Sequence, residues 1–198
     1  VEGQSLRDKL AKEGELPIAE AVRILRDVVD ALKHAHKHNV VHRDIKPDNV
    51  MLSERHALVT DFGVAKAISD ATGAVGLTTE GVALGTPAYM SPEQASADPH
   101  IDHRADIYAV GVIAYELLTG RTPFVGNTQQ ELLAAHVTQT PEPVTKYRES
   151  VPPALAALVM KCLEKDREAL LEMAKRARAC ALPDATDRVV RICEEAMA

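Results

Sequence analysis

The sequence predicts a mainly α-helical fold (α+β) with small β-hairpins, and three observations lead to that prediction. From Ile18 to Lys37, apolar side chains recur at three- and four-residue steps, the spacing of one helix face. The stretch Arg104–Thr119 is apolar nearly all round, as expected of a buried central helix. Between these two stretches lie apolar runs of only two or three residues, which are too short for helices and indicate small strands.

The first helix and the strands can be bounded from local signals. Pro17 stands at the start of the first helix, where a missing N–H costs nothing, and Asn39 can end it. We expect strands at Val40–Val41, Val50–Leu52 and Ala57–Val59.

The second half of the chain is expected to be helical after a long irregular segment. Residues 61–99 are rich in Gly, Pro, Ser and Thr, and an irregular segment of this length inside a domain is usually functional. Beyond the buried helix, we expect helices over residues 128–137 and 153–165, with a proline-rich loop between them. A helical tail follows, with helices over residues 167–181 and 189–197.

Composition and charge exclude several classes of protein. The 198 residues, 46% hydrophobic and 26% charged, are typical of one to one and a half globular domains. A net charge of −6 provides no basic field for a polyanion, and two Phe, four Tyr and no Trp offer few stacking surfaces. We therefore expect no nucleic-acid partner.

Membrane and secretion signals are lacking in the sequence. The longest strongly apolar stretch, Ile107–Tyr115, has half the length needed to cross a bilayer. The first residues contain neither the basic nor the apolar segment of a secretion signal. Three Cys without a CxxC pair fit a reducing compartment. These features predict a cytoplasmic location and no membrane segment in this chain.

The residues that can carry chemistry stand on two neighbouring loops. Asp44, Lys46 and Asn49 lie between two apolar runs, where they could accept a proton, bind a phosphate oxygen and ligate a metal. Asp61 follows the next apolar run and supplies a second hard oxygen ligand suited to Mg²⁺. Each piece alone is common in loops, so only their combination indicates a function.

Four motifs occur in one fixed order: HRDIKPDN at 42–49, DFG at 61–63, GTPAYMSPE at 85–93, and Asp106 near the start of the buried helix. In this order they resemble the C-terminal lobe (C-lobe) of a eukaryotic-like Ser/Thr protein kinase of the bacterial branch. The resemblance covers residues 1–166 and implies a kinase-like C-lobe there, with residues 167–198 as a helical tail of uncertain origin.

The resemblance implies a role for each motif residue near the reaction. Asp44 would be the catalytic base that accepts the proton of the substrate hydroxyl, and Lys46 would steady the transferring phosphoryl group. Asn49 and Asp61 would hold Mg²⁺ on the phosphates of ATP. Thr86 would tie the substrate-docking loop to the catalytic base.

Other positions would bind the adenine or support the site. Val1 would lie beside the adenine edge and Met51 would form the floor under the ring. His42 and Phe62 would pack in the family's regulatory hydrophobic column. Asp106 would hydrogen-bond the backbone of the HRD loop, although a plain helix N-cap is the alternative.

The Pro-Glu motif departs from the family pattern in its partner. Glu93 usually pairs with an Arg that follows a Lys-Asp-Pro sequence, but Leu170 stands where that Arg is expected. We therefore expect Glu93 to be unpaired or to recruit Arg167, and a buried carboxylate without its partner is costly.

Thr78 and Thr79 are candidate phosphorylation sites in the loop before the Pro-Glu motif. Arg43, beside the catalytic base, would be the partner of the phosphate, whose charge would order the loop. The alternative is a polar loop in which neither Thr is modified.

The histidines near the end of the first helix do not form an expected metal site. Positions i, i+2 and i+4 do not all face one way on a helix, so a solvated or capping role is expected of them. A surface role is expected of the two histidines just before the buried helix. These residues are His34, His36, His38, His100 and His103.

Parts that phosphoryl transfer needs are not found among these residues. The family's glycine-rich loop, strand Lys and paired Glu lie in a first lobe, and the first six residues resemble the hinge that follows it. We therefore expect the missing first lobe as a partner and little activity from this chain alone. The face around Leu6, Met51 and Phe62 would then be exposed and favour self-association.

The tail resembles another family. Residues 167–189 are similar to the C-terminal helices of the peptidoglycan glycosyltransferase that adds N-acetylglucosamine to lipid I, without any of its substrate-binding motifs. If that similarity reflects origin, the chain is a fusion, a chimera or a mis-assembled reading frame.

Two functions remain open from the sequence. The first is an enzyme fragment that transfers the γ-phosphate of ATP to Ser/Thr hydroxyls of a protein substrate with the help of Mg²⁺. The second is a non-catalytic binding or regulatory module that uses the docking surface without transfer.

Overall fold

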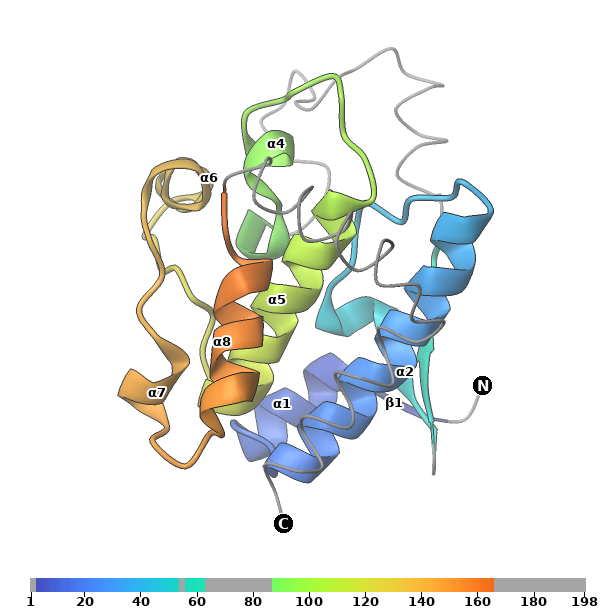
Figure 1. Cartoon of the computed structure of the whole chain (residues 1–198), viewed down its shortest axis with the longest axis vertical. Coiled ribbons are helices and arrows are strands. Elements are labelled where there is room, and N and C mark those ends of the chain that lie inside the picture. Colours follow the sequence, from blue (N-terminus) through green and yellow to red (C-terminus); the bar gives the residue numbers. More distant parts are fainter. Residues whose placement is uncertain (1–2, 54–55, 63–86, 166–198) are drawn as a thin grey trace.

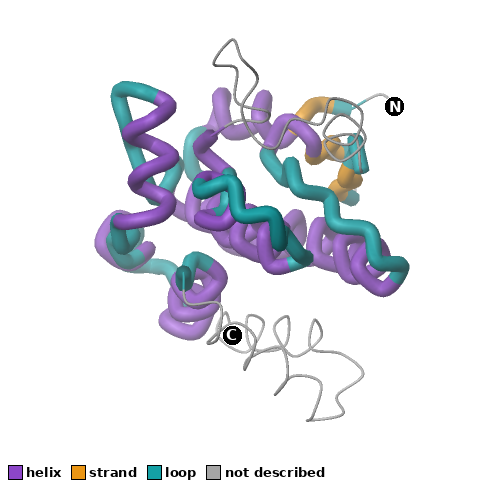
Figure 2. The backbone as a smooth tube through the Cα atoms, turned by 90° about the horizontal axis from the view of Figure 1, so that it is seen from above, coloured by secondary structure: helices purple, strands orange, loops and turns teal. Residues whose placement is uncertain are grey.

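The computed structural model of the chain describes residues 3–53, 56–62 and 87–165. Helices surround one central helix, and the strands lie together on one side of the molecule (Figures 1 and 2). The elements in chain order are β1 (Gln4–Ser5), α1 (Leu6–Glu13), α2 (Ile18–Lys37), the 3-10 turn η1 (Pro47–Asn49), β2 (Val50–Leu52), β3 (Ala57–Val59), the 3-10 turn η2 (Pro87–Tyr89), α4 (Pro92–Ala95), α5 (Arg104–Thr119), α6 (Gln129–Thr138), α7 (Val144–Tyr147) and α8 (Pro153–Cys162).

Helix α2 has the bounds that its apolar spacing predicts. Its buried residues, among them Ala21, Ile24 and Val28, form one face that packs on α5 and β3. Asn39 follows the end of the helix with a φ of 59°, in the left-handed region that Asn tolerates.

Helix α5 is the centre of the core, as its composition predicts. Nearly every residue of the helix is buried, and α2 and α8 pack against it from two sides (Figure 1). Gly111 permits the approach of α8, because a Cβ at this position would lie 2.7 Å from the Cβ of Cys162.

Three short strands form one antiparallel sheet in the order β1-β2-β3. Met51 pairs with Ser5 on one side and with Leu58 on the other. The prediction of a strand at Val40–Val41 is wrong. The Val40 amide donates to the carbonyl of Ala35 and so closes the end of α2 instead of entering a sheet.

The structure also contains elements that the sequence analysis did not predict. Helix α1 begins with a capping box, in which Ser5 and Asp8 each bond the other's backbone amide. Helix α7 lies within the stretch expected to be a loop, and η2 and α4 interrupt the segment 61–99. The predicted tail helices, at 167–181 and 189–197, lie outside the described residues.

One part of the expected exposed face is wrong. Leu6 is fully buried in the core instead of lying on a surface, because α1 packs against η1 and the sheet. Met51 is half-buried and Phe62 is exposed. Leu58, which pairs with Met51, is exposed as well. The expected self-association stays a prediction.

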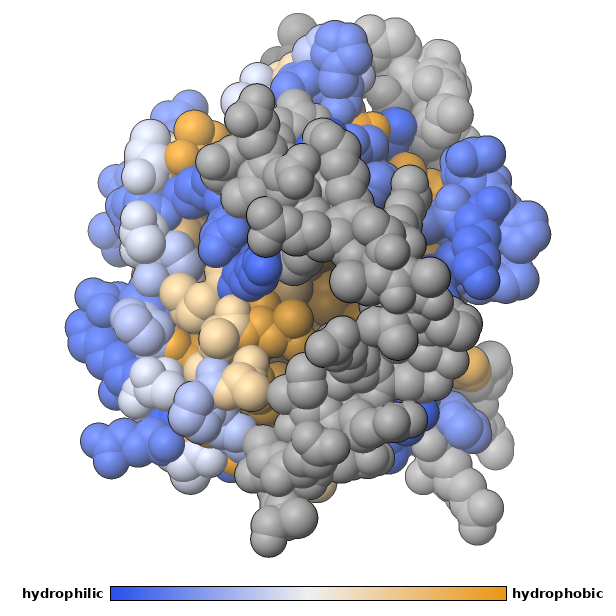
Figure 3. Space-filling view, in the orientation of Figure 1, coloured by the Kyte–Doolittle hydropathy of each residue, from blue (hydrophilic) through white to orange (hydrophobic). Residues whose placement is uncertain are grey.

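The surface shown in Figure 3 combines apolar and polar areas. Hydrophobic side chains gather near the middle of this face, over α5 and α8, with hydrophilic side chains around them. Within the described ranges, no helix is both long enough and apolar enough to cross a bilayer.

The buried ring of His136 predicts that the stability of the fold depends on pH. His136 of α6 is fully buried, and its Nδ1 lies 2.9 Å from the hydroxyl of Tyr108. Burial, together with the charge of Lys165, lowers the pKa of His136 from 6.5 to about 4. The folded protein therefore keeps the ring neutral at a pH where the unfolded chain protonates it.

The contribution of His136 is complete above pH 6.5 and is lost as the pH falls toward 4, since the unfolded state binds the extra proton. We expect the free energy of unfolding to fall by roughly 2–3 kcal/mol between pH 7 and 4.5, because the pKa of His136 is 6.5 in the unfolded chain and about 4 in the folded protein. Urea unfolding of wild type and His136→Asn at both pH values measures it. His38→Asn, at an exposed ring, is the control, and an equal pH dependence in wild type and His136→Asn would contradict the account.

Candidate active site

The HRD loop connects α2 to the 3-10 turn η1 with an unusual backbone. Arg43 has a φ of 69°, a left-handed conformation that a non-glycine residue adopts only where its surroundings hold it. The His42 side chain is buried, and its Nε2 lies 2.8 Å from the carbonyl oxygen of Thr60. This contact holds the loop against Thr60, which lies 18 positions further along the sequence.

The Asp106 carboxylate holds this loop from the first turn of α5. Its Oδ2 accepts the amide of His42 at 2.9 Å, and its Oδ1 accepts the amide of Arg43 at 2.8 Å. The Asp106 side chain is fully buried. Two successive backbone donors thus share one carboxylate, which leaves neither of them unpaired.

A third group reaches the same carboxylate. The Nε2 of His36 lies 2.7 Å from Oδ2 of Asp106, so the expectation of a solvated or capping role is wrong for His36. The ring faces the core because α2 packs on α5. The described residues contain no cluster of three or more His, Cys, Asp or Glu side chains suited to a metal ion.

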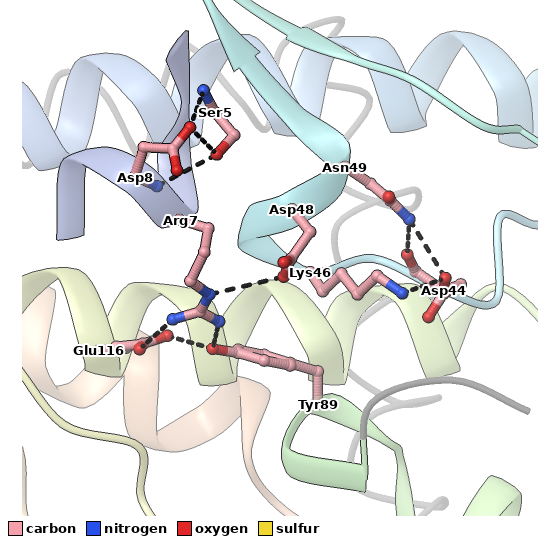
Figure 4. A network of polar contacts seen from close by, with 9 residues as sticks. All are labelled: Ser5, Arg7, Asp8, Asp44, Lys46, Asp48, Asn49, Tyr89 and Glu116. Carbon is pink, nitrogen blue, oxygen red and sulfur yellow. Dashed lines mark hydrogen bonds and ion pairs between the residues drawn. The ribbon is translucent and has the colours of Figure 1, made fainter. Parts of the chain in front are cut away.

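The three polar residues of the loop converge on one point (Figure 4). The Nζ of Lys46 lies 2.8 Å from Oδ2 of Asp44, and the Nδ2 of Asn49 donates to the same oxygen at 3.2 Å. Asn49 also donates to the backbone carbonyl of Asp44 at 2.8 Å. A carboxylate, a cation and a carboxamide are therefore held together.

The strand pair β2–β3 brings Asp61 to the end of the sheet at which Asn49 lies. The Thr60 amide donates to the carbonyl of Asn49 at 2.9 Å, one step beyond the Val50–Val59 pair. Asp61 follows directly with a φ of 62° and an exposed side chain. Asn49 and Asp61, twelve positions apart in sequence, are thus brought to the same end of one ladder.

The oxygen atoms at this end suit a hard divalent cation. Because Nδ2 of Asn49 faces Asp44, its Oδ1 is left free to ligate, and it accepts no hydrogen bond among the described residues. Within those residues, the Asp61 carboxylate has only a 3.4 Å contact with the Thr60 hydroxyl. A carboxamide and a carboxylate oxygen are ligands that Mg²⁺ accepts.

The residues assigned to the adenine floor and the hydrophobic column lie around this loop. The rings of His42 and Phe62 lie 4.7 Å apart between centroids. Met51 occupies the middle strand of the sheet and is half-buried.

Gln94, in the motif that follows η2, is a further support of the loop that the sequence did not predict. The Nε2 of Gln94 donates to the carbonyl of Arg43 at 2.6 Å. Ser91 and Gln94 also form a capping box that starts α4. The only signal in the sequence was the Ser-Pro-Glu-Gln order, which is typical of a helix start.

Glu93 lies near Arg104 at the start of α5. The pKa of Arg104 is raised chiefly by its hydrogen bond to Asp102, and the charge of Glu93 adds to this effect. Arg167, the alternative partner expected for Glu93, lies outside the described residues.

Several predicted site residues cannot be placed, because they lie outside the described residues. These are Val1, Thr78, Thr79 and Thr86. Arg43, the expected phosphate partner, is described, and its Nε is buried without a hydrogen-bond partner among the residues that the structure describes.

Comparison with known proteins defines the class. The sequence model of the protein kinase domain matches residues 1–177, and the chain belongs to this family. Among relatives, the chain is 38% identical over 180 residues to serine/threonine-protein kinase PknB of Mycobacterium leprae, covering 90% of this chain and 28% of the relative. It is 40% identical over 185 residues to serine/threonine-protein kinase pkn3 of Myxococcus xanthus, covering 88% and 34%.

By family, the chain is therefore a bacterial serine/threonine-protein kinase sequence, as the motif order predicted. The chain spans about a third or less of the length of these relatives.

The geometry of Asp106 predicts a large stability effect. Asp106→Ala leaves two backbone amides of the loop without an acceptor, and each buried unpaired group costs about 1–3 kcal/mol. We expect the free energy of unfolding to fall by about 2–5 kcal/mol, measured by urea denaturation, and hydrogen exchange of the two amides to accelerate. Asp30→Ala, at an exposed site on α2, is the control. A loss no greater than that of Asp30→Ala would show that the carboxylate does not hold the loop.

Proposed function

We propose that this chain carries the catalytic and protein-substrate-binding part, the C-lobe, of an ATP- and Mg²⁺-dependent Ser/Thr protein kinase. The observation that carries the proposal is the convergence of Asp44, Lys46 and Asn49 at the end of the sheet from which Asp61 projects. A family match alone would be compatible with a loop that had lost this geometry.

Each residue has a definite task in the proposed reaction. The Asp44 carboxylate accepts the proton of the substrate hydroxyl as that oxygen attacks the γ-phosphorus of ATP. Lys46, held beside Asp44, places a positive charge where negative charge develops on the transferring group. Asn49 and Asp61 would hold Mg²⁺, which neutralises the phosphate oxygens when it is bound.

Turnover by the chain is proposed to depend on groups outside these 198 residues. The glycine-rich loop and the strand Lys that cover the ATP phosphates in this family are not in the sequence. We propose that a first lobe supplies them and that the chain alone transfers little phosphate to a basic protein substrate.

Mg-ATP binding separates the enzyme proposal from a non-catalytic module. By calorimetry with a separately supplied first lobe, Asp61→Asn should weaken Mg-ATP binding about tenfold or more, because a charged ligand of the metal is lost. Asp44→Asn should bind Mg-ATP as wild type does but transfer no phosphate. Asp30→Asn is the control for loss of charge. Equal Mg-ATP binding by wild type and Asp61→Asn would refute the metal assignment.

We further propose that phosphorylation of Thr78 or Thr79 supplies a partner for Arg43. The buried Nε of Arg43, without an acceptor in the described part of the chain, supports this role. Replacing both Thr residues by Ala in a complete enzyme should lower activity sharply, since the loop loses its ordering charge. Unchanged kinetics of this double variant would refute the proposal.

Other expectations from the sequence stay predictions. These are the kinase boundary at residue 166, the glycosyltransferase-like origin of the tail and the cytoplasmic location.

A further inference from the structure

The first turn of α1 is fixed so that one face points into the molecule. Ser5 and Asp8 close its capping box, with Oδ2 of Asp8 accepting the Ser5 amide at 3.2 Å and hydroxyl at 2.7 Å. Leu6 and Leu10 are buried in the core on that face. Arg7, between them, is directed toward α5 (Figure 4).

The Arg7 guanidinium contacts three separate elements. Nη1 donates to Oε1 of Glu116 in α5 at 3.0 Å, and Nη2 donates to the hydroxyl of Tyr89 in η2. Nε lies 3.5 Å from Oδ2 of Asp48 in η1. Figure 4 shows the guanidinium lying between these three side chains. One planar group thus connects the catalytic loop, the η2 turn and the central helix.

The charged groups in this network stabilise one another. Glu116 is a buried carboxylate in an otherwise apolar stretch of α5, and such a group is costly without partners. Burial would lower the pKa of Arg7, but its bonds and charge interactions with Tyr89 and Glu116 outweigh this and raise it. Burial and the charge of Glu116 raise the pKa of Tyr89, so its hydroxyl stays protonated and donates to Oε2 of Glu116 at 2.5 Å.

Two of the elements that Arg7 contacts, η1 and η2, belong to the proposed site. Asp48 stands directly before Asn49 and two residues after Lys46, and Tyr89 stands three residues after Thr86. A guanidinium has several donors in a rigid plane, whereas a Lys ammonium is a single compact charge. Holding two elements at a fixed separation therefore needs Arg at this position.

We infer that Arg7 is a positioning residue, which holds the η2 turn at a fixed distance from the catalytic loop and so shapes the surface that receives the protein substrate. The inference rests on the proposed function, since it takes the η2 turn as part of the docking surface. The nucleotide and metal positions, Asn49 and Asp61, make no described contact with Arg7. Its loss should therefore weaken peptide binding without weakening Mg-ATP binding.

Whether Arg7 holds the η2 turn is tested without any substrate. In Arg7→Ala, amide exchange at Met90, whose amide bonds to Pro87 within the η2 turn, should accelerate about tenfold or more, the equivalent of one charge-assisted hydrogen bond. Ethylguanidinium should slow this exchange again by filling the vacated position, while Arg7→Lys should recover only part of the protection. Lys12→Ala, which removes a charge from the exposed face of the same helix, should leave Met90 exchange unchanged, with or without ethylguanidinium. No acceleration in Arg7→Ala, or full recovery in Arg7→Lys, would overturn the inference.

The role in substrate positioning needs a second measurement on the same variants, each with the first lobe separately supplied. The probe is a fluorescent peptide of residues 74–83 of this sequence, which contains both candidate acceptor threonines. Arg7→Ala should bind it about tenfold more weakly than wild type and Lys12→Ala, with Mg-ATP affinity changed less than about twofold. Equal losses for both ligands would mean a merely structural role and overturn the inference. If wild type binds Mg-ATP but not the peptide, the substrate role is refuted, while the exchange result still decides whether Arg7 holds the η2 turn. If wild type binds neither, the proposed function fails.

Discussion

The structure depends on one buried carboxylate. Asp106 projects from the first turn of the central helix and accepts two successive amides of the HRD loop, with His36 against the same oxygen as one of them. Because a buried carboxylate is stable only with partners, and buried amides need acceptors, each side requires the other. The left-handed backbone of Arg43 is a consequence, since the loop must bend to present both amides.

The remaining contacts extend this constraint outward. The loop is held from the sheet side by the contact of His42 with Thr60, and from the α4 side by Gln94. Arg7 adds a link from α1 to both η1 and η2. Catalysis of phosphoryl transfer consists mainly of positioning and preorganised charge, so a rigid support around a few polar side chains is what such a site needs.

The sequence predicted the parts of this structure that are periodic or that follow a known motif order. Helices α2 and α5 were predictable because their apolar spacing covers many residues, whereas α1 has only two buried positions among charged ones. The strand at Val40–Val41 was predicted wrongly, because the Val40 amide donates to the Ala35 carbonyl at the end of α2 and is not available to a strand. The supporting contacts of His36 and Arg7 could not be predicted, because neither a motif nor a periodicity links these residues to partners 70 and 109 residues away. Glu116 carried a signal, because it is the one charged residue of α5 after the first turn of the helix.

The central claim is that Asp44, Asn49 and Asp61 surround one divalent ion and the terminal phosphate of a nucleotide. Paramagnetic broadening by Mn²⁺-ATP, observed by NMR on isotope-labelled protein with its first lobe supplied, tests this claim most directly. The account predicts that resonances of Asn49 and Asp61 broaden first and together, that Asp44 follows, and that α7 and α8 are unaffected. Broadening centred on any other surface, or on Asn49 and Asp61 at separate sites, would contradict it.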